Sequence, residues 1–187
     1  LIEPQTINGV ANSIHLEAKD TTTQFYSGFD SPTKCYQSVD DSGNNSSNTY
    51  LGPTIRIQAT NSNSSASGTQ MVDKGSKLSS GTSVRFKVKN SCTIADPNSG
   101  GHTGNTNISS HWHGLHCDGY TDGNGFNTVA SGNEWVMTMP IYQQAGTNWY
   151  HTHIHHQTGV DSYKGLAGLF IIDAVSYTHL RAHETAY

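Results

Sequence analysis

The chain has 187 residues, enough for one domain with a hydrophobic core. Only 13% of the residues are charged and the formal net charge is −4, so no basic surface is expected that would bind nucleic acid or acidic lipid. The longest apolar run, at residues 165–172, is too short to cross a bilayer, and the sequence predicts no membrane span.

Short segments rich in alternating apolar, β-branched and aromatic residues predict β-strands along the chain. In chain order they occupy residues 13–18, 54–59, 83–90, 134–142, 148–155 and 168–173. In the third segment, Val84, Phe86 and Val88 are expected to face a core while the charged residues between them face water. Turn-rich stretches separate the strands, and no segment shows a sustained helical period. The pattern predicts an all-β fold, an antiparallel sandwich or Greek-key barrel.

Three cysteines, Cys35, Cys92 and Cys117, are spread along the chain. Their spacing fits no metal motif such as Cys-x-x-Cys, and spacing alone does not reveal disulfide partners. One disulfide and one free thiol is the simplest expectation.

The end of the chain differs in character from the rest. Residues 175–185 are similar to the conceptual translation of a sequencing-library adapter, and such a segment carries no information about the fold. We therefore expect residues 1–174 to form one domain of a longer protein and residues 175–187 to be a non-native tail. The alternative is a short native polar helix. His179 and His183, which lie in the tail, are assigned no role.

Two histidine pairs have a single residue between their members: His111 with His113, and His151 with His153. Alternate residues of a strand face the same side, with Cα atoms about 6.5–7 Å apart, so each pair is expected to present both imidazoles on one face. Two such strands side by side would gather four imidazoles in one patch, which could hold more than one metal ion. Imidazole suits copper, zinc, iron and nickel, and copper(II) is the most tightly bound of the divalent ions.

Each histidine pair belongs to a longer motif. The first reads His-Trp-His-Gly-Leu and is followed by Asp-Gly, and the second reads Asn-Trp-Tyr-His-Thr-His and is followed by a Gly- and Leu-rich strand. These motifs, with two strands upstream, resemble the copper motifs of the multicopper oxidases, the group that contains the laccases. The matching segments are residues 51–56, 81–90, 111–115, 122–123, 144–153 and 165–172. The resemblance implies a Greek-key β-sandwich or barrel of cupredoxin type, in agreement with the strand pattern.

The resemblance also implies a set of copper ligands. His111 would bind a type 2 copper, His113 and His151 one of two coupled type 3 coppers, and His153 the other. In the family, these coppers reduce O2 to water with electrons from a reducing substrate. Asp122 matches a catalytic acidic residue that helps to deliver protons near the cluster, and the alternative is an Asp-Gly turn formed for backbone reasons.

The same resemblance indicates which parts of an oxidase this chain lacks. A type 1 copper takes two histidines, a cysteine and a weak axial methionine, and in the family these come from a later domain, as do the other ligands of the three-copper cluster. Cys117 follows His116 but has no histidine on its other side. We therefore predict the amino-terminal domain of a secreted or periplasmic oxidase, which carries half of the cluster and is inactive without its downstream domain.

Three other interpretations of the histidines stay open. A zinc site would need one more ligand and a bound water. A copper-scavenging module would take up copper without consuming oxygen. A purely structural domain would need none of the four imidazoles, and it is disfavoured because all four are present.

Overall fold

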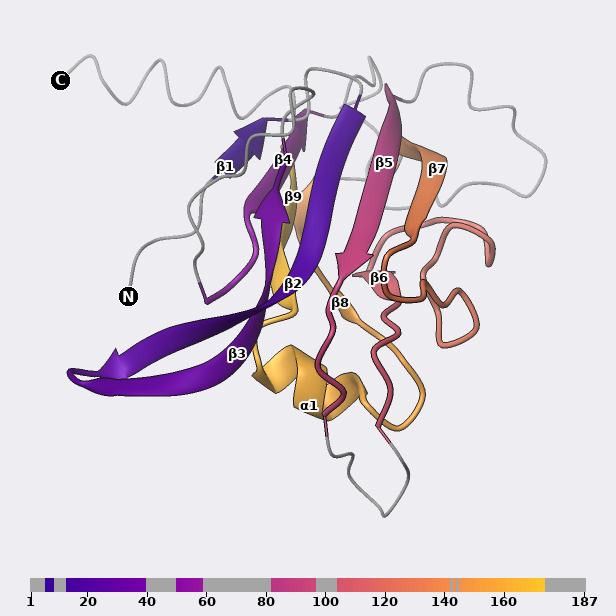
Figure 1. The fold of residues 1–187 in the computed structure, drawn as a ribbon. Coiled ribbons are helices and arrows are strands. Elements are labelled where there is room, and N and C mark those ends of the chain that lie inside the picture. Colours follow the sequence, from indigo (N-terminus) through magenta and orange to yellow (C-terminus); the bar gives the residue numbers. More distant parts are fainter. Residues whose placement is uncertain are drawn as a thin grey trace, which may run out of the picture.

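The computed structural model describes residues 6–8, 13–39, 50–58, 82–96, 104–141, 143 and 145–173. Within these ranges the chain forms two sheets that pack as a sandwich, with one short helix at one end (Figure 1). The five-stranded sheet contains, in spatial order, β1 (Thr6–Asn8), β4 (Thr54–Gln58), β9 (Ala167–Asp173), β8 (Gly146–Thr152) and β6 (Ser110–His113). The four-stranded sheet contains β3 (Phe29–Ser38), β2 (Ser13–Tyr26), β5 (Thr82–Ser91) and β7 (Glu134–Ile141). The helix α1 (Thr158–Tyr163) joins β8 to β9, and no helix in the described ranges is long and apolar enough to cross a membrane.

The hydrophobic core lies between the two sheets. Val84, Phe86 and Val88 of β5 are fully buried, while the charged residues between them are partly or fully exposed, which confirms the alternation predicted for this strand. The ring of Phe86 lies 4.5 Å from that of Trp112 and 6.1 Å from that of Phe170, both in the opposite sheet, measured between ring centroids. Burial of each such large apolar side chain stabilises the fold by about 1.5–3 kcal/mol.

The all-β fold class is confirmed, and each of the six predicted segments overlaps a strand. These segments do not include β1, β3, β6 or α1, although the argument from the histidine spacing treats residues 111–113 as part of a strand. Five consecutive residues in the second half of β3 are buried, so this strand lacks the alternation of apolar and polar residues that predicts a strand. The helix α1 has six residues, too few to show a helical period. The prediction of antiparallel sheets is wrong for β1–β4, β4–β9 and β2–β5, which pair in parallel. Parallel partners need long crossover connections, and local turn signals do not reveal them.

The expected disulfide is also wrong, because all three cysteines are free thiols. Cys35 of β3 pairs with Lys19 of β2, whereas β5, which ends just before Cys92, pairs with the opposite edge of β2. The two buried cysteines are therefore about two strand spacings, or 9–10 Å, apart, and a disulfide needs Cα atoms within about 7 Å. Burial raises the pKa of Cys35 to about 11 and that of Cys92 to about 12, which keeps both thiols protonated.

Four charged side chains, which we call the ion cluster, meet where α1 packs near β3. Lys34 Nζ lies 3.0 Å from Asp96 Oδ2 and 3.0 Å from Asp161 Oδ1, and these three side chains are at most 3% exposed. Lys164 pairs with Asp96 from a half-buried position. Burial raises the pKa of Asp161 to about 6, although Lys34 opposes the rise. Two lysines and two aspartates thus balance one another inside the protein.

The pairing of β6 with β8 determines which of their side chains face outward. Trp112 and Tyr150 lie opposite each other across these strands and are fully buried in the core. The adjacent pair, His111 and His151, therefore points to the outer face of the sheet. Gly168 of β9 makes room for Tyr150, because a Cβ at this position would lie 2.4 Å from the Tyr150 ring.

Candidate metal centre

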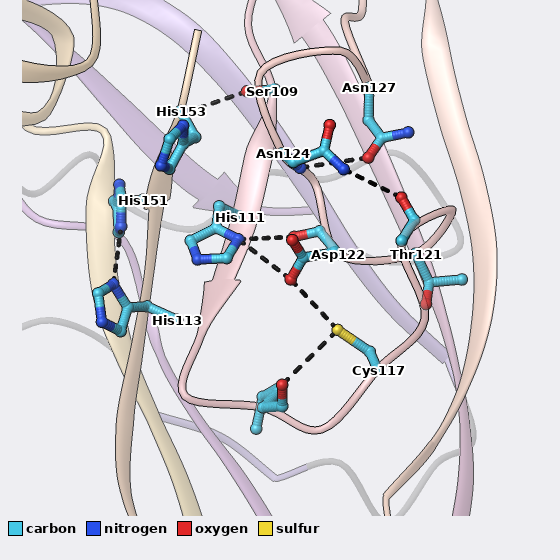
Figure 2. A network of polar contacts seen from close by, with 12 residues as sticks. Ser109, His111, His113, Cys117, Thr121, Asp122, Asn124, Asn127, His151 and His153 are labelled. Atoms are coloured by element: carbon cyan, nitrogen blue, oxygen red, sulfur yellow. Dashed lines mark hydrogen bonds and ion pairs between the residues drawn. The ribbon is translucent and has the colours of Figure 1, made fainter.

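The four histidines predicted as ligands lie together at one end of the five-stranded sheet (Figure 2). His111 and His113 belong to β6, and His151 of β8 lies directly opposite His111. β8 ends one residue before His153, whose backbone N–H donates to the Ser109 carbonyl oxygen at 3.0 Å. The two pairs therefore meet in one patch, as the alternation in the sequence predicts.

The imidazole rings are close enough to share bound ions. Centroids of the ring pairs in contact within this group are 5.1–5.7 Å apart, and candidate ligand atoms of His111, His113 and His151 all lie within 4.8 Å of one another. His113 Nδ1 and His151 Nε2 are 3.3 Å apart. Two nitrogens bound to one ion at about 2.0 Å, at an angle between right and tetrahedral, are about 2.8–3.3 Å apart. The His113–His151 pair thus has the spacing of two ligands of one ion.

Backbone carbonyls hold two of the rings in a single tautomer. The Nδ1 of His111 donates to the Asp122 carbonyl oxygen at 2.9 Å, and the Nδ1 of His151 donates to the Thr152 carbonyl oxygen at 2.7 Å. A carbonyl only accepts a hydrogen bond, so Nδ1 carries the proton in both rings and Nε2 keeps its lone pair. Metal-binding histidines are commonly fixed in this way through their second nitrogen.

The environment also favours the neutral form of His151. Burial lowers its pKa to about 4, and the neighbouring imidazoles of His111, His153 and His113 add to the decrease, against the hydrogen bond to Thr152. The ring is therefore unprotonated at neutral pH, as a metal ligand must be. Three imidazoles whose candidate ligand atoms lie close together, two of them held by carbonyls through Nδ1, form a donor set that fits a copper or zinc ion.

Asp122 lies beside the cluster, in the loop that follows β6 (Figure 2). Its Oδ1 is 3.3 Å from His111 Nδ1, and its carbonyl oxygen also accepts the backbone N–H of Trp112. The next residue, Gly123, has a φ of 70°, and a Cβ there would lie 1.8 Å from the Ser110 carbonyl oxygen. This tight turn requires a glycine at position 123, and it places the Asp122 carboxylate against His111, a candidate ligand.

Several features of the site are absent from the sequence prediction. The Cys117 thiol donates to Asp122 Oδ1 at 3.4 Å, and the ring of Trp149 stacks on that of His151. The contact of Trp149 could have been predicted, because it lies two residues before His151 and so shares its face of the strand. The carbonyl partners of the histidines could not have been predicted, since every residue has a carbonyl group.

The remaining histidines near these motifs lie outside the group of close ligand atoms. His116, His155 and His156 are exposed. The rings of His155 and His156 contact each other, with centroids 3.8 Å apart. His102, His179 and His183 lie outside the described residues.

Comparison with known proteins places these motifs in a family. Residues 60–176 match a family described as multicopper oxidase. The chain is 29% identical over 173 residues to the multicopper oxidase mco of Staphylococcus aureus, covering 92% of this chain and 29% of that protein. It is 38% identical over 81 residues to Laccase-1 of Pleurotus ostreatus, covering 41% of this chain and 15% of that protein.

A solved structure shows the same fold. The McoA multicopper oxidase of Aquifex aeolicus superposes with a TM-score of 0.67 at 21% identity, covering 97% of this chain and 31% of that one. The chain thus spans less than a third of the length of these relatives. The family match covers more than half of the chain and includes both histidine pairs. The chain belongs to the multicopper oxidase family.

Proposed function

We propose that this chain is the amino-terminal domain of a copper-dependent oxidase that couples one-electron oxidation of a reducing substrate to four-electron reduction of O2 to water. The observation that carries the proposal is the convergence of His111, His113 and His151, whose candidate ligand atoms lie within 4.8 Å of one another. Membership of the multicopper oxidase family favours copper as the ion. Bound copper supplies the one-electron chemistry.

Each residue of the site has a distinct role in this proposal. His113 and His151 hold one type 3 copper, which the 3.3 Å between their facing nitrogens supports. His153 holds the other type 3 copper, and His111 holds the type 2 copper. Asp122 holds and releases protons beside the cluster, a role supported by its contact with His111 and needed because the formation of water consumes protons.

The chain provides only part of such a centre. Four imidazoles are too few to complete the coordination of three ions, and the chain spans 29% of its Staphylococcus aureus relative. We propose that the remaining ligands and the type 1 copper belong to a later domain of a longer protein. The isolated chain then binds copper weakly and does not reduce O2. The reducing substrate would be a phenol, a metal ion or another donor, and the later domain would receive its electrons. The protein would be exported to the periplasm or out of the cell.

Copper titration of the metal-free chain tests the site directly. We expect copper(II) to bind with an electron paramagnetic resonance spectrum that shows nitrogen ligands, and His113→Ala and His151→Ala to weaken binding. His155→Ala changes an exposed neighbour and is the matched control. A preference for zinc over copper would favour the zinc interpretation, and failure to bind either metal would overturn the site.

The oxidase reaction is tested in a longer gene product that includes the sequence downstream. That sequence should contain a further His-x-His and a His-Cys-His segment. The complete protein should consume oxygen with a phenolic donor, and His113→Ala should abolish this activity while the blue type 1 colour remains. Copper uptake without oxygen consumption by the complete protein would favour the scavenging module.

A further inference from the structure

Trp149 occupies a special place between the two histidines assigned to one ion. It lies on β8, two residues before His151 and on the same face, and the pairing of β6 with β8 sets it directly opposite His113. Its ring is stacked on His151, with centroids 4.1 Å apart and an interplanar angle of 26°. It is also stacked on His113, at 5.1 Å and 29°. One indole therefore contacts both imidazoles.

His113 differs from the other two histidines in how its ring is held. Carbonyl oxygens fix the rings of His111 and His151. Among the residues that the structure describes, His113 has no carbonyl or carboxylate partner, and its ring contacts are with other rings. The torsion that sets the plane of an imidazole has broad, weakly defined minima. The hydrogen-bond partner of His113 Nδ1 is His151 Nε2, the facing candidate ligand atom. This hydrogen bond is lost when both nitrogens bind an ion, so a packing contact is then needed to keep the His113 ring directed at the ion.

We propose that Trp149 is a positioning residue of the copper site, whose indole fixes the ring planes of His113 and His151 so that both nitrogens face one ion. The inference rests on the copper site proposed above. An indole suits this task because its flat face matches an imidazole in stacking and its N–H offers no lone pair that would compete for the ion.

Simple coverage of apolar surface is the competing explanation, and the chain contains a matched comparison. Leu169 of β9 lies directly opposite Trp149 on its other side. The two side chains are similarly exposed, at 39% for Trp149 and 46% for Leu169. If Trp149 only covered the sheet, leucine would replace it without harm to the site. Stacking instead requires an aromatic ring at this position.

The experiment uses the metal-free chain and its variants Trp149→Leu, Trp149→Phe and Leu169→Ala. We expect Trp149→Leu to lower copper(II) affinity about tenfold, within the range found when groups that orient metal ligands are removed. Trp149→Phe should restore most of the affinity because it keeps a stacking ring, and Leu169→Ala should leave it unchanged. The electron paramagnetic resonance spectrum of bound copper should change in Trp149→Leu alone.

A second measurement needs no metal and separates this inference from the proposed function. In the metal-free wild-type chain, the indole ring current should shift the ring-proton resonances of His113 and His151, and Trp149→Leu should abolish the shifts. Wild-type-like copper affinity in Trp149→Leu, or absence of the shifts in the wild type, would overturn the positioning role. A wild-type chain that shows the shifts but binds no copper would instead overturn the proposed function.

Discussion

Two polar clusters in this protein differ in burial and in charge balance. The ion cluster of Lys34, Asp96, Asp161 and Lys164 contains its own counter-charges. The four histidines are bases of one kind, gathered on an outer face with Asp122 beside one of them. The charges of the first cluster balance one another within the fold. In the second, candidate ligand atoms of His111, His113 and His151 lie within 4.8 Å of one another, an arrangement that suits a cation from outside. Internal charge balance thus distinguishes the ion cluster, and close ligand atoms of one kind distinguish the candidate metal centre.

Lys34→Met should give the largest effect. It leaves two buried aspartates without their shared partner, and the loss of one member of a buried ion pair costs about 3–5 kcal/mol. Urea unfolding at neutral pH measures this cost, and copper affinity of the folded protein should not change. Lys164→Met, at a side chain 26% exposed, is the control and should cost less. A free energy of unfolding equal to that of the wild type in Lys34→Met would show that the ion cluster does not stabilise the fold.

Acid should destabilise the metal-free chain through His151. Burial and the neighbouring imidazoles lower its pKa from 6.5 to about 4 in the folded state, while the unfolded chain keeps an ordinary value. The unfolded state therefore binds the proton more readily, and the stability present above pH 6.5 is lost as the pH falls to about 4. The loss approaches about 3 kcal/mol, at about 1.4 kcal/mol per pKa unit.

Urea midpoints between pH 7 and pH 4 in wild type and His151→Gln isolate this contribution. The comparison is needed because Asp161, whose pKa is raised, titrates over part of the same range with the opposite sign. The stability curve of the variant should be flatter. Parallel curves for the two proteins would show that His151 is not buried in its neutral form.

Copper should stabilise the wild-type chain and not its ligand variants. An ion that binds only the folded state adds about 2.7 kcal/mol at a free concentration one hundred times its dissociation constant. Thermal unfolding with and without copper(II) measures the gain. His113→Ala should lose most of it, and Lys34→Met should keep it despite its lower starting stability. Equal gains in wild type and His113→Ala would place the copper elsewhere.

Cys117→Ala should give the smallest effect. The thiol has a pKa raised to about 12 by burial and by Asp122, so it stays protonated and donates to this carboxylate. Loss of a hydrogen bond of this kind costs about 0.5–1.5 kcal/mol, and Cys117→Ser should recover part of it. Thermal unfolding of the two variants provides the measurement. An unchanged melting temperature in Cys117→Ala would show that the contact contributes nothing to the loop.

The parts of the fold that follow from local pattern could be predicted from the sequence. The alternation in β5 is a property of neighbouring residues, and it places Val84, Phe86 and Val88 in the core. The parallel pairing of β2 with β5 joins strands far apart in the chain, and no local signal reports it. The helix α1 is too short to show a period, and the buried side of β3 includes polar residues such as Lys34 and Gln37.

The same division applies to the candidate site. That His111 and His113 share a face follows from the period of a strand. That His111 lies opposite His151, and His113 opposite Trp149, depends on the register between two strands, which no segment of sequence contains by itself. The roles of the stacked indole and of the carbonyl partners become visible only once this register is known.

The register of β6 against β8 restricts where residues can be inserted into the chain. Insertion of a single residue within either strand would invert its parity, turning imidazoles into the core and Trp112 or Tyr150 towards water. Insertion of two residues would keep the parity but give each histidine a new neighbour across the sheet. Libraries that diversify this protein should therefore leave these two strands at fixed length, together with the Asp122–Gly123 turn that places a carboxylate beside His111.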